Sequence, residues 1–208
     1  PGATRLFLQF LAGRARQAEA LYILGDLFET WIGDDDIDEP YHAEIVSALR
    51  AASDAGLKIS VMHGNRDFLL GSGFTAASGT LLLKDPYVLS TAEWQFVLSH
   101  GDALCLDDSA YMAFRAQVRS PEWQATLLAK PLSERRAIAA HMREVSESSQ
   151  RGKDNPYTDL QAAATDDFLR EHGYATFIHG HTHQPATHDH IVDGIHVERW
   201  VMSDWHED

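Results

Sequence analysis

Short apolar runs alternate with amphipathic segments along the chain. Ala20 to Leu24 and residues 59–62 are apolar runs of strand length, whereas residues 2–17 and 41–55 repeat apolar side chains at the spacing of a helix face. The order strand, helix, strand predicts a βαβ unit with parallel strands. Further strands are expected at 80–90, 94–99, 175–178 and 195–202, and a further helix at 159–172. The pattern therefore indicates an α/β fold.

Residues 107–153 interrupt this alternation with a long helical stretch. Pro121 and Pro131 divide it into short helices, because proline cannot continue a helix. The stretch separates two core strands by more than an ordinary loop, so we expect an inserted helical cap. The expected boundaries are residues 1–104 and 156–208 for the core and residues 105–155 for the cap.

Several expected strands end at a glycine beside a polar side chain. The pairs are Gly25-Asp26, Gly64-Asn65, His100-Gly101 and Gly180-His181. Taken alone, Asp26 is explained equally well as a helix N-cap, and a surface tract like His188 and His190 is the less favoured alternative for the last histidines. The carboxyl ends of parallel strands share one edge of a sheet, however, and His181 and His183 are spaced to point the same way. The repeated pattern therefore predicts a shared site at that edge.

The side chains expected at this edge form a set of metal ligands. They are Asp26, Asn65, His100, His181 and His183. A carboxylate, an amide oxygen and imidazoles without a thiolate suit Mn²⁺, Fe²⁺, Zn²⁺ or Ni²⁺ and disfavour a structural zinc site. Two ions ~3.5–4 Å apart, bridged by a carboxylate, can bind a phosphoryl group and acidify a water molecule. The set therefore predicts hydrolysis of a phosphoester or phosphoanhydride.

Charge and composition narrow the classes of partner. The net charge of −14 argues against nucleic-acid binding. Residues 105–153 carry eight Lys and Arg against six acidic residues, which suggests an anionic partner at this segment. The acidic run at 34–39 is expected to be a solvated surface without a ligand. The single Cys105 fits a reducing compartment and is expected to be a small buried residue.

These motifs resemble a known superfamily. The series Gly25-Asp26, Gly64-Asn65-Arg66-Asp67, His100-Gly101-Asp102 and Gly180-His181-Thr182-His183 is similar to that of the calcineurin-like metallophosphoesterases. Residues 24–36, 63–71 and 178–183 resemble more closely the UDP-2,3-diacylglucosamine hydrolases of bacterial lipid A synthesis, and the likeness runs nearly end to end. Arg66 stands where the superfamily usually has histidine, which favours the lipid A enzymes.

The resemblance implies a four-layer αββα sandwich that binds two Mn²⁺ ions. Asp26 would bridge the ions, Asn65, His100 and His181 would bind one of them, and His183 would bind the other. The implied reaction is attack at the α-phosphate of UDP-2,3-diacylglucosamine, which releases UMP and 2,3-diacylglucosamine 1-phosphate (lipid X). The implied catalytic residues are Asp26, Asn65, Arg66, His100 and His181. The implied substrate-binding residues are Asn65, Arg66, Asp108, Ser146, Gln150, Lys153 and His181. Ser146 and Gln150 are equally consistent with plain helix surface.

The resemblance also implies a peripheral protein on the cytoplasmic side of the cell inner membrane. Membrane contact is expected through the cap, where Trp123, Leu127 and Leu128 lie among basic residues. The family opens with a strand that ends in an Asp-x-His pair, and this pair is absent here. We therefore expect that the chain begins downstream of that pair and ends early, with one well-held ion and one weak or empty position.

Two other functions remain open at this point. The first is a related phosphoesterase that acts on a soluble nucleotide, although Arg66 and the apolar cap argue against it. The second is a metal-binding module without activity. The sequence also leaves open the acyl-chain length, the physiological metal, the oligomeric state, and whether Arg66 or His179 protonates the leaving group.

Overall fold

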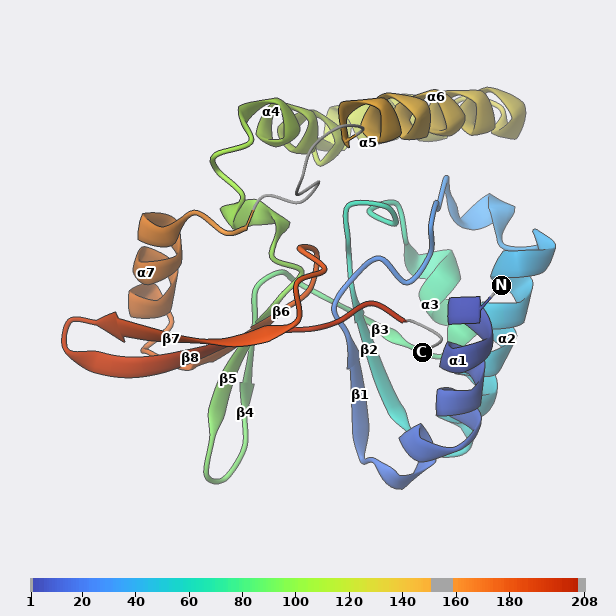
Figure 1. Cartoon of the computed structure of the whole chain (residues 1–208). Coiled ribbons are helices and arrows are strands. Elements are labelled where there is room, and N and C mark those ends of the chain that lie inside the picture. The colour runs from blue at the N-terminus through green and yellow to red at the C-terminus, as the bar shows by residue number, and fades with distance from the viewer. Residues whose placement is uncertain (1, 151–158, 206–208) are drawn as a thin grey trace.

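The computed structural model of the chain describes residues 2–150 and 159–205, and within them two β-sheets lie side by side (Figure 1). The first sheet has the order β1-β2-β3. Its strands are β1 (Ala20–Ile23), β2 (Lys58–Met62) and β3 (Leu81–Leu83). The second sheet has the order β4-β5-β6-β8-β7. Its strands are β4 (Tyr87–Ser90), β5 (Gln95–Ser99), β6 (Thr176–His179), β7 (Ala186–Val192) and β8 (Ile195–Val201).

The first sheet is parallel, which confirms the predicted βαβ unit. Ile23 of β1 lies opposite Val61 of β2, so both strands deliver their next residues to the same edge. In the second sheet β5, β6 and β8 are parallel to one another, and Ser99 lies opposite His179. The strands β4 and β7 pair antiparallel with β5 and β8, respectively. The strand ends that carry the predicted ligands therefore meet from both sheets.

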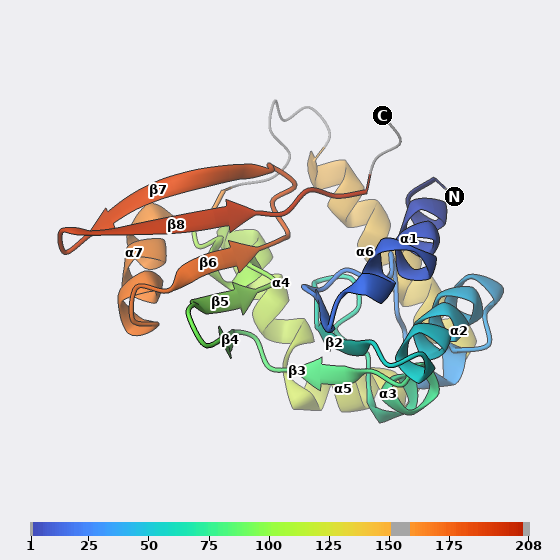
Figure 2. The same cartoon turned by 90° about the horizontal axis from the view of Figure 1, so that it is seen from below.

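Helices cover the outer face of each sheet (Figures 1 and 2). The first sheet is covered by α1 (Gly2–Ala12), α2 (Pro40–Asp54) and α3 (Ser72–Ser78), and the second by α7 (Ala162–Glu171). One buried cluster joins Leu11 and Leu49 to Val61 of the first sheet, and another joins Leu169 to Phe177 of the second. The order helix, sheet, sheet, helix is the four-layer arrangement that the resemblance implies.

Three further helices lie beyond the ligand-bearing strand ends, at the top of Figure 1. They are α4 (Ser109–Val118), α5 (Pro121–Leu128) and α6 (Leu132–Gln150). Pro121 occupies the first turn of α5, where no backbone donor is lost, and the Ser120 side chain caps that helix by accepting from the amide of Trp123 at 3.2 Å. No helix among the described residues is both long and apolar enough to cross a membrane.

Two expectations about strands and one about a helix are wrong. The strand expected at 80–90 is two strands, because the chain passes from the first sheet to the second between β3 and β4. The strand β7 was not expected, since its Thr, His and Asp residues hide the alternation of an edge strand. The helix expected at 2–17 ends at Ala12, and a short 3-10 helix follows Gly13.

The acidic run is not merely a solvated surface, which corrects the expectation from its composition. The Asp34 carboxylate accepts from the amides of Gly71 at 3.0 Å and Gly73 at 2.7 Å, where α3 begins. Asp35 binds the guanidinium of Arg135, which is 3% exposed. Asp36 pairs with Arg136 of the same helix, α6. The run therefore fastens helix α6 to the loops of the first sheet.

Candidate metal centre

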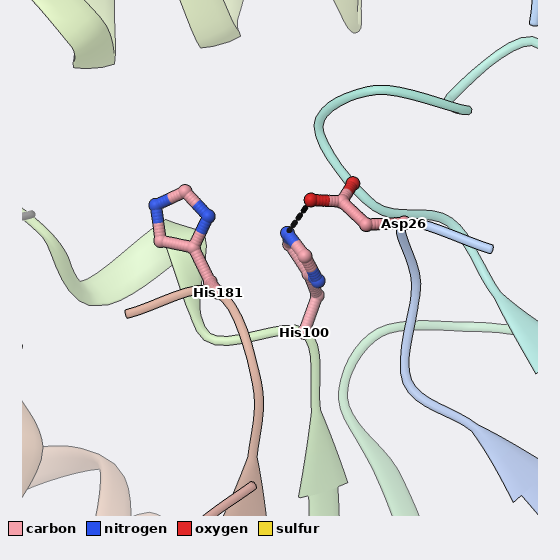
Figure 3. Close-up of side chains that lie close together, drawn as sticks. All are labelled: Asp26, His100 and His181. Atoms are coloured by element: carbon pink, nitrogen blue, oxygen red, sulfur yellow. Dashed lines mark ion pairs between the residues drawn. The ribbon is translucent and has the colours of Figure 1, made fainter. Parts of the chain in front are cut away.

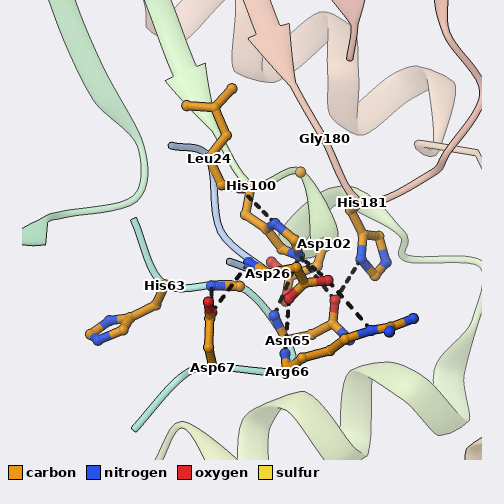
Figure 4. A network of polar contacts seen from close by, with 12 residues as sticks. Leu24, Asp26, His63, Asn65, Arg66, Asp67, His100, Asp102, Gly180 and His181 are labelled. Carbon is orange, nitrogen blue, oxygen red and sulfur yellow. Dashed lines mark hydrogen bonds and ion pairs between the residues drawn. The ribbon is translucent and has the colours of Figure 1, made fainter. Parts of the chain in front are cut away.

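Four of the predicted ligands converge at the ends of β1, β2, β5 and β6 (Figures 3 and 4). One ligand atom each of Asp26, His100 and His181 lies within 4.8 Å of the others, and no second such group of His, Cys or acidic side chains is found in the described part of the chain. The Asn65 Oδ1 atom lies 2.9 Å from His100 Nε2 and 2.9 Å from His181 Nδ1. The amide oxygen therefore lies between the two rings.

The close approach of two loops depends on two glycines. A Cβ atom at Gly25 would lie 2.6 Å from the Cα of Gly64, and one at Gly64 would lie 2.1 Å from the Asp26 Oδ1 atom. Gly25 also has a φ of +90°, which side-chain-bearing residues rarely adopt. These glycines let the loop after β1 touch the loop after β2. Asp26 thereby comes close to Asn65.

Asp67 joins the loop after β1 to the loop after β2 through its carboxylate. Its buried carboxylate accepts four backbone N–H groups, from Asp26 at 3.2 Å, Leu27 at 2.7 Å, Phe28 at 3.3 Å and Gly64 at 2.7 Å. Burial, followed by the nearby charge of Asp26, raises the pKa of Asp67 to about 6. The sequence offered Asp67 only as part of a motif, and its role depends on donors about 40 residues away.

The hydrogen bonds of His100 leave one ring nitrogen for a cation. Its Nδ1 lies 2.8 Å from the Leu24 carbonyl oxygen, which can only accept, so Nδ1 carries the hydrogen. The Nε2 atom then faces Asn65 Oδ1 and lies 3.8 Å from Asp26 Oδ2. Burial alone lowers the pKa of His100, but the charges of Asp26 and Asp102 raise it overall. The carboxylates that favour a proton on Nε2 favour a metal ion there equally.

His181 supplies a second imidazole ring, and this ring is neutral. Burial, followed by the charge of His100, lowers the pKa of His181 to about 4, so the imidazole keeps a lone pair at neutral pH. Its backbone φ is +66° and that of His183 is +53°, so the turn after β6 is held in a conformation that non-glycine residues seldom adopt. The donor set of carboxylate, amide oxygen and two imidazole rings fits a divalent ion.

His183 does not join this group, although the sequence predicts it as a ligand. It lines the same pocket, and its Nδ1 atom lies 3.3 Å from Asp204 Oδ2. No sequence motif singled out Asp204, which follows the last strand. The structure therefore brings Asp26, Asn65, His100 and His181 together and leaves His183 beside them.

Residues of helix α4 and Arg119 after it stabilise the segments around the candidate metal centre. The buried Asp102 carboxylate accepts from Tyr111 Oη at 2.8 Å and from Arg115 Nε at 2.9 Å, and Arg119 donates to the Gly64 carbonyl at 3.0 Å. Burial alone would raise the pKa of Asp102, but His100 and Arg115 lower it to about 2. The carboxylate is therefore ionised and ties α4 to the segment after β5, and Arg119 ties the end of α4 to the loop after β2. Tyr111, Arg115 and Arg119 carried no motif that could have revealed this role.

A pocket of about 250 Å³ extends from the ligand group under the cap helices. Its polar end includes Asp26, Asn65, Arg66, His181 and His183. Its apolar part includes Trp31, Phe68, Phe114, Trp123, Leu127, Ile138 and Met142. Leu127 is 7% exposed whereas Leu128 is 42% exposed, so the expectation that both face a membrane is wrong for Leu127.

The other predicted substrate contacts are only partly described. Asp108 and Ser146 line the pocket, and the Asp108 carboxylate also caps α4 by accepting from the Tyr111 amide at 2.9 Å. Gln150 is the last residue of α6, and Lys153 lies outside the described residues. Among the described side chains, Asp108 and Ser146 are therefore the predicted contacts that the pocket includes.

Arg66 and His179 are the two groups proposed to protonate a leaving group. Arg66 lines the pocket, with its Nε atom 3.8 Å from Asp26 Oδ2. His179 is fully buried, and its two nitrogens contact the Gly180 carbonyl at 2.9 Å and Arg199 at 3.1 Å. Burial lowers the pKa of His179 to about 4, so its ring is neutral. Of the two, Arg66 is the residue within reach of a substrate.

Similarity to known proteins decides the family. The chain is 50% identical over 207 residues to the UDP-2,3-diacylglucosamine hydrolase of Chromobacterium violaceum, covering 99% of this chain and 85% of the relative. It is 46% identical over 208 residues to the enzymes of the same name from Aromatoleum aromaticum and Klebsiella pneumoniae, covering 84% and 86% of them. The chain belongs to the UDP-2,3-diacylglucosamine hydrolase family.

The other comparisons add little to this family assignment. No protein-family model matches the chain. A solved structure described as a novel archaeal phosphodiesterase is 11% identical, with a TM-score of 0.38 over 97% of this chain and 76% of that one, and this likeness carries no weight. Membership of the UDP-2,3-diacylglucosamine hydrolase family therefore rests on the sequence similarity.

Proposed function

We propose that the chain hydrolyses the pyrophosphate of UDP-2,3-diacylglucosamine at the α-phosphate and releases UMP and 2,3-diacylglucosamine 1-phosphate. The observation that carries the proposal is one pocket with metal ligands at one end and apolar side chains from the cap at the other. A substrate with a charged pyrophosphate and two acyl chains needs both environments side by side. A soluble nucleotide would leave the apolar part of the pocket unused.

The metal proposed for the centre is Mn²⁺, held by Asp26, Asn65, His100 and His181, with Asp26 and His183 available to a second ion. A bound metal would supply positive charge to the phosphoryl oxygens and lower the pKa of a bound water molecule. Arg66 would bind an oxygen of the pyrophosphate, since its guanidinium lies in the pocket beside Asp26. The cap would keep bulk water from the site, because its apolar side chains form one wall of the pocket.

The remaining substrate contacts are proposed from the family resemblance. Asp108 and Ser146 would meet the substrate in the pocket, and Gln150 and Lys153 would meet it where the cap returns to the core. We further propose that the residues of 105–155 act as one cap on the core formed by residues 1–104 and 156–208. The pocket supports this division, because α4, α5 and α6 contribute the larger part of its apolar lining.

The substrate of the relatives carries two acyl chains, so we propose peripheral binding to the cytoplasmic side of the inner membrane. The exposed side chains of Leu128 on α5 and Val145 on α6 support contact through the cap. Vesicles of phosphatidylglycerol and phosphatidylethanolamine would test this step. Leu128→Ser is expected to weaken sedimentation with these vesicles, and unchanged sedimentation would argue against contact through α5.

The reaction is tested with UDP-2,3-diacylglucosamine in water labelled with ¹⁸O and with Mn²⁺ present. Attack at the α-phosphate places the label in UMP, and attack at the other phosphorus places it in the lipid phosphate. Mass spectrometry of both products is expected to find the label in UMP. Label in the lipid phosphate, or equal turnover of the acyl-free UDP-sugar, would contradict the proposal.

A further inference from the structure

The turn that presents His181 depends on the orientation of one peptide group. His181 has a φ of +66°, and such a backbone persists only where surrounding contacts hold it. The Gly180 amide donates to the His100 carbonyl at 3.1 Å, and the Gly180 carbonyl accepts from the Thr182 amide at 2.8 Å. Hydrogen bonds therefore hold both the amide and the carbonyl of Gly180, directly before His181 in the chain.

A third contact to this glycine comes from the buried ring of His179. The His179 Nδ1 atom lies 2.9 Å from the Gly180 carbonyl oxygen, and a carbonyl can only accept. Nδ1 therefore carries the hydrogen, which leaves Nε2 as an acceptor. That Nε2 atom lies 3.1 Å from Nη1 of Arg199, which donates to it. The two contacts fix both the tautomer and the angle of the ring.

Arg199 is itself held on several sides. It lies in β8, which pairs with β6, and it is 4% exposed. Its two terminal nitrogens donate to the Asp159 carboxylate at 3.0 and 3.1 Å, and its Nε donates to His190 at 3.3 Å. A planar guanidinium can make these bonds at once, whereas a lysine ammonium cannot reproduce the fork. Neither Arg199 nor His179 lines the pocket, so neither contacts a substrate there.

We propose that Arg199 and His179 are positioning residues that fix the Gly180–His181 peptide and thereby aim the His181 imidazole at the metal centre. The proposal rests on the metal centre described above and adds to it the residues that orient one ligand. Outer partners of metal ligands typically change metal affinity by 10–100-fold when they are lost.

The first test is the affinity of the metal-free protein for Mn²⁺, measured by calorimetry. Arg199→Lys keeps the charge and is expected to raise the dissociation constant by about 10–100-fold. Arg170→Lys is the matched control, because Arg170 also makes a forked pair with a carboxylate, from its Nε and Nη2 atoms to Asp193 at 2.7 and 3.0 Å, on an exposed surface. An unchanged dissociation constant in a folded Arg199→Lys protein would overturn the proposal.

A pair of variants at His179 keeps the test decisive if Arg199→Lys does not fold. His179→Asn retains an N–H donor close to the position of Nδ1, and His179→Leu removes it. The Asn variant is expected to bind Mn²⁺ more tightly than the Leu variant. Equal affinities in the two variants, whether lost or intact, would overturn the role of His179.

The metal affinities test the positioning role of Arg199 and His179 separately from the proposed hydrolysis. If the unaltered protein binds Mn²⁺ but does not cleave UDP-2,3-diacylglucosamine, the function fails while the metal affinities still test Arg199 and His179. If the unaltered protein binds no Mn²⁺, the positioning role is overturned together with the metal centre.

Discussion

The Asn65 Oδ1 atom lies 2.9 Å from the Nδ1 atom of His181, although 116 residues separate them in the chain. This contact joins the end of β2 in the first sheet to the end of β6 in the second (Figure 4). The same oxygen lies 2.9 Å from the Nε2 atom of His100. One amide thus links the strand ends of both sheets at the proposed metal centre.

Removal of that amide is expected to abolish metal-dependent hydrolysis. Asn65→Ala deletes a proposed ligand, so we expect kcat/KM to fall by more than about 100-fold, beyond the loss typical of an outer partner. Initial rates at saturating Mn²⁺ measure this. Gln161→Ala is the control, because that amide caps α7 away from the pocket by accepting from Ala164 at 2.6 Å. Similar rates for the Asn65 variant and the unaltered protein would contradict the assignment.

Arg135 is expected to stabilise the packing of α6 on the first sheet. Its guanidinium donates to the Ile32 carbonyl at 2.6 Å, to the Lys130 carbonyl at 3.0 Å, and to Asp35. Arg135→Met leaves these carbonyls without donors, so the free energy of unfolding is expected to fall by about 2–4 kcal/mol. Urea unfolding measures the change. Lys130→Met breaks only the exposed pair with Glu134 and should cost no more than about 0.5 kcal/mol. Equal losses would disprove the anchoring role.

Glu29 is expected to compete with the anionic substrate. Its carboxylate binds Arg66 and also accepts from Arg143 Nη2 at 3.2 Å, and all three residues line the pocket. Exposed ion pairs contribute at most about 1 kcal/mol, so Glu29→Gln should lower KM by up to about 5-fold with little change in kcat. Steady-state kinetics decide the outcome, with Glu134→Gln on α6 as the control. A higher KM would mean that Glu29 assists binding.

The pair of Asp159 with Arg199 predicts a pH dependence of stability. Burial alone would raise the pKa of Asp159, but the hydrogen bond from Arg199 lowers it below its usual value of 3.8. Because the folded pKa is the lower one, the stabilisation is complete above pH 3.8 and is lost as the pH falls through the folded value. Asp159→Asn should therefore be less stable than the unaltered protein at pH 6, and the difference should shrink toward pH 3. A difference that is constant with pH in urea unfolding would contradict this.

The sequence predicted those features of the fold that depend on local pattern and on parallel topology. Asp26 and Asn65 follow apolar runs joined by one helix, and parallel strands must end at the same edge. His100 and His181 could be placed near them because each follows a strand at a glycine. Within each sheet their convergence therefore follows from a rule that applies to any parallel sheet, whereas the meeting of the two sheets does not follow from it.

The features that the sequence could not predict depend on partners far apart in the chain. From its composition, the acidic run was expected to be a solvated surface. Its partners Arg135 and Arg136 lie about 100 residues away in the sequence, so the pattern of the run itself does not reveal them. The crossing between sheets at 84–86 was missed, although Pro86 within the expected strand is a signal that the strand is interrupted. Asp67 likewise accepts from backbone groups about 40 residues away, and Arg199 binds the side chains of Asp159 and His179. Only the folded structure shows that these partners are close.

The most direct test of the metal centre is a crystal structure of the Mn²⁺-loaded protein with anomalous scattering measured at the manganese edge. We expect a peak within about 2.5 Å of a carboxylate oxygen of Asp26, of Asn65 Oδ1, of His100 Nε2 and of a ring nitrogen of His181. A peak remote from Asn65 and His181, with those side chains left uncoordinated, would contradict the metal centre on which the proposed hydrolysis depends.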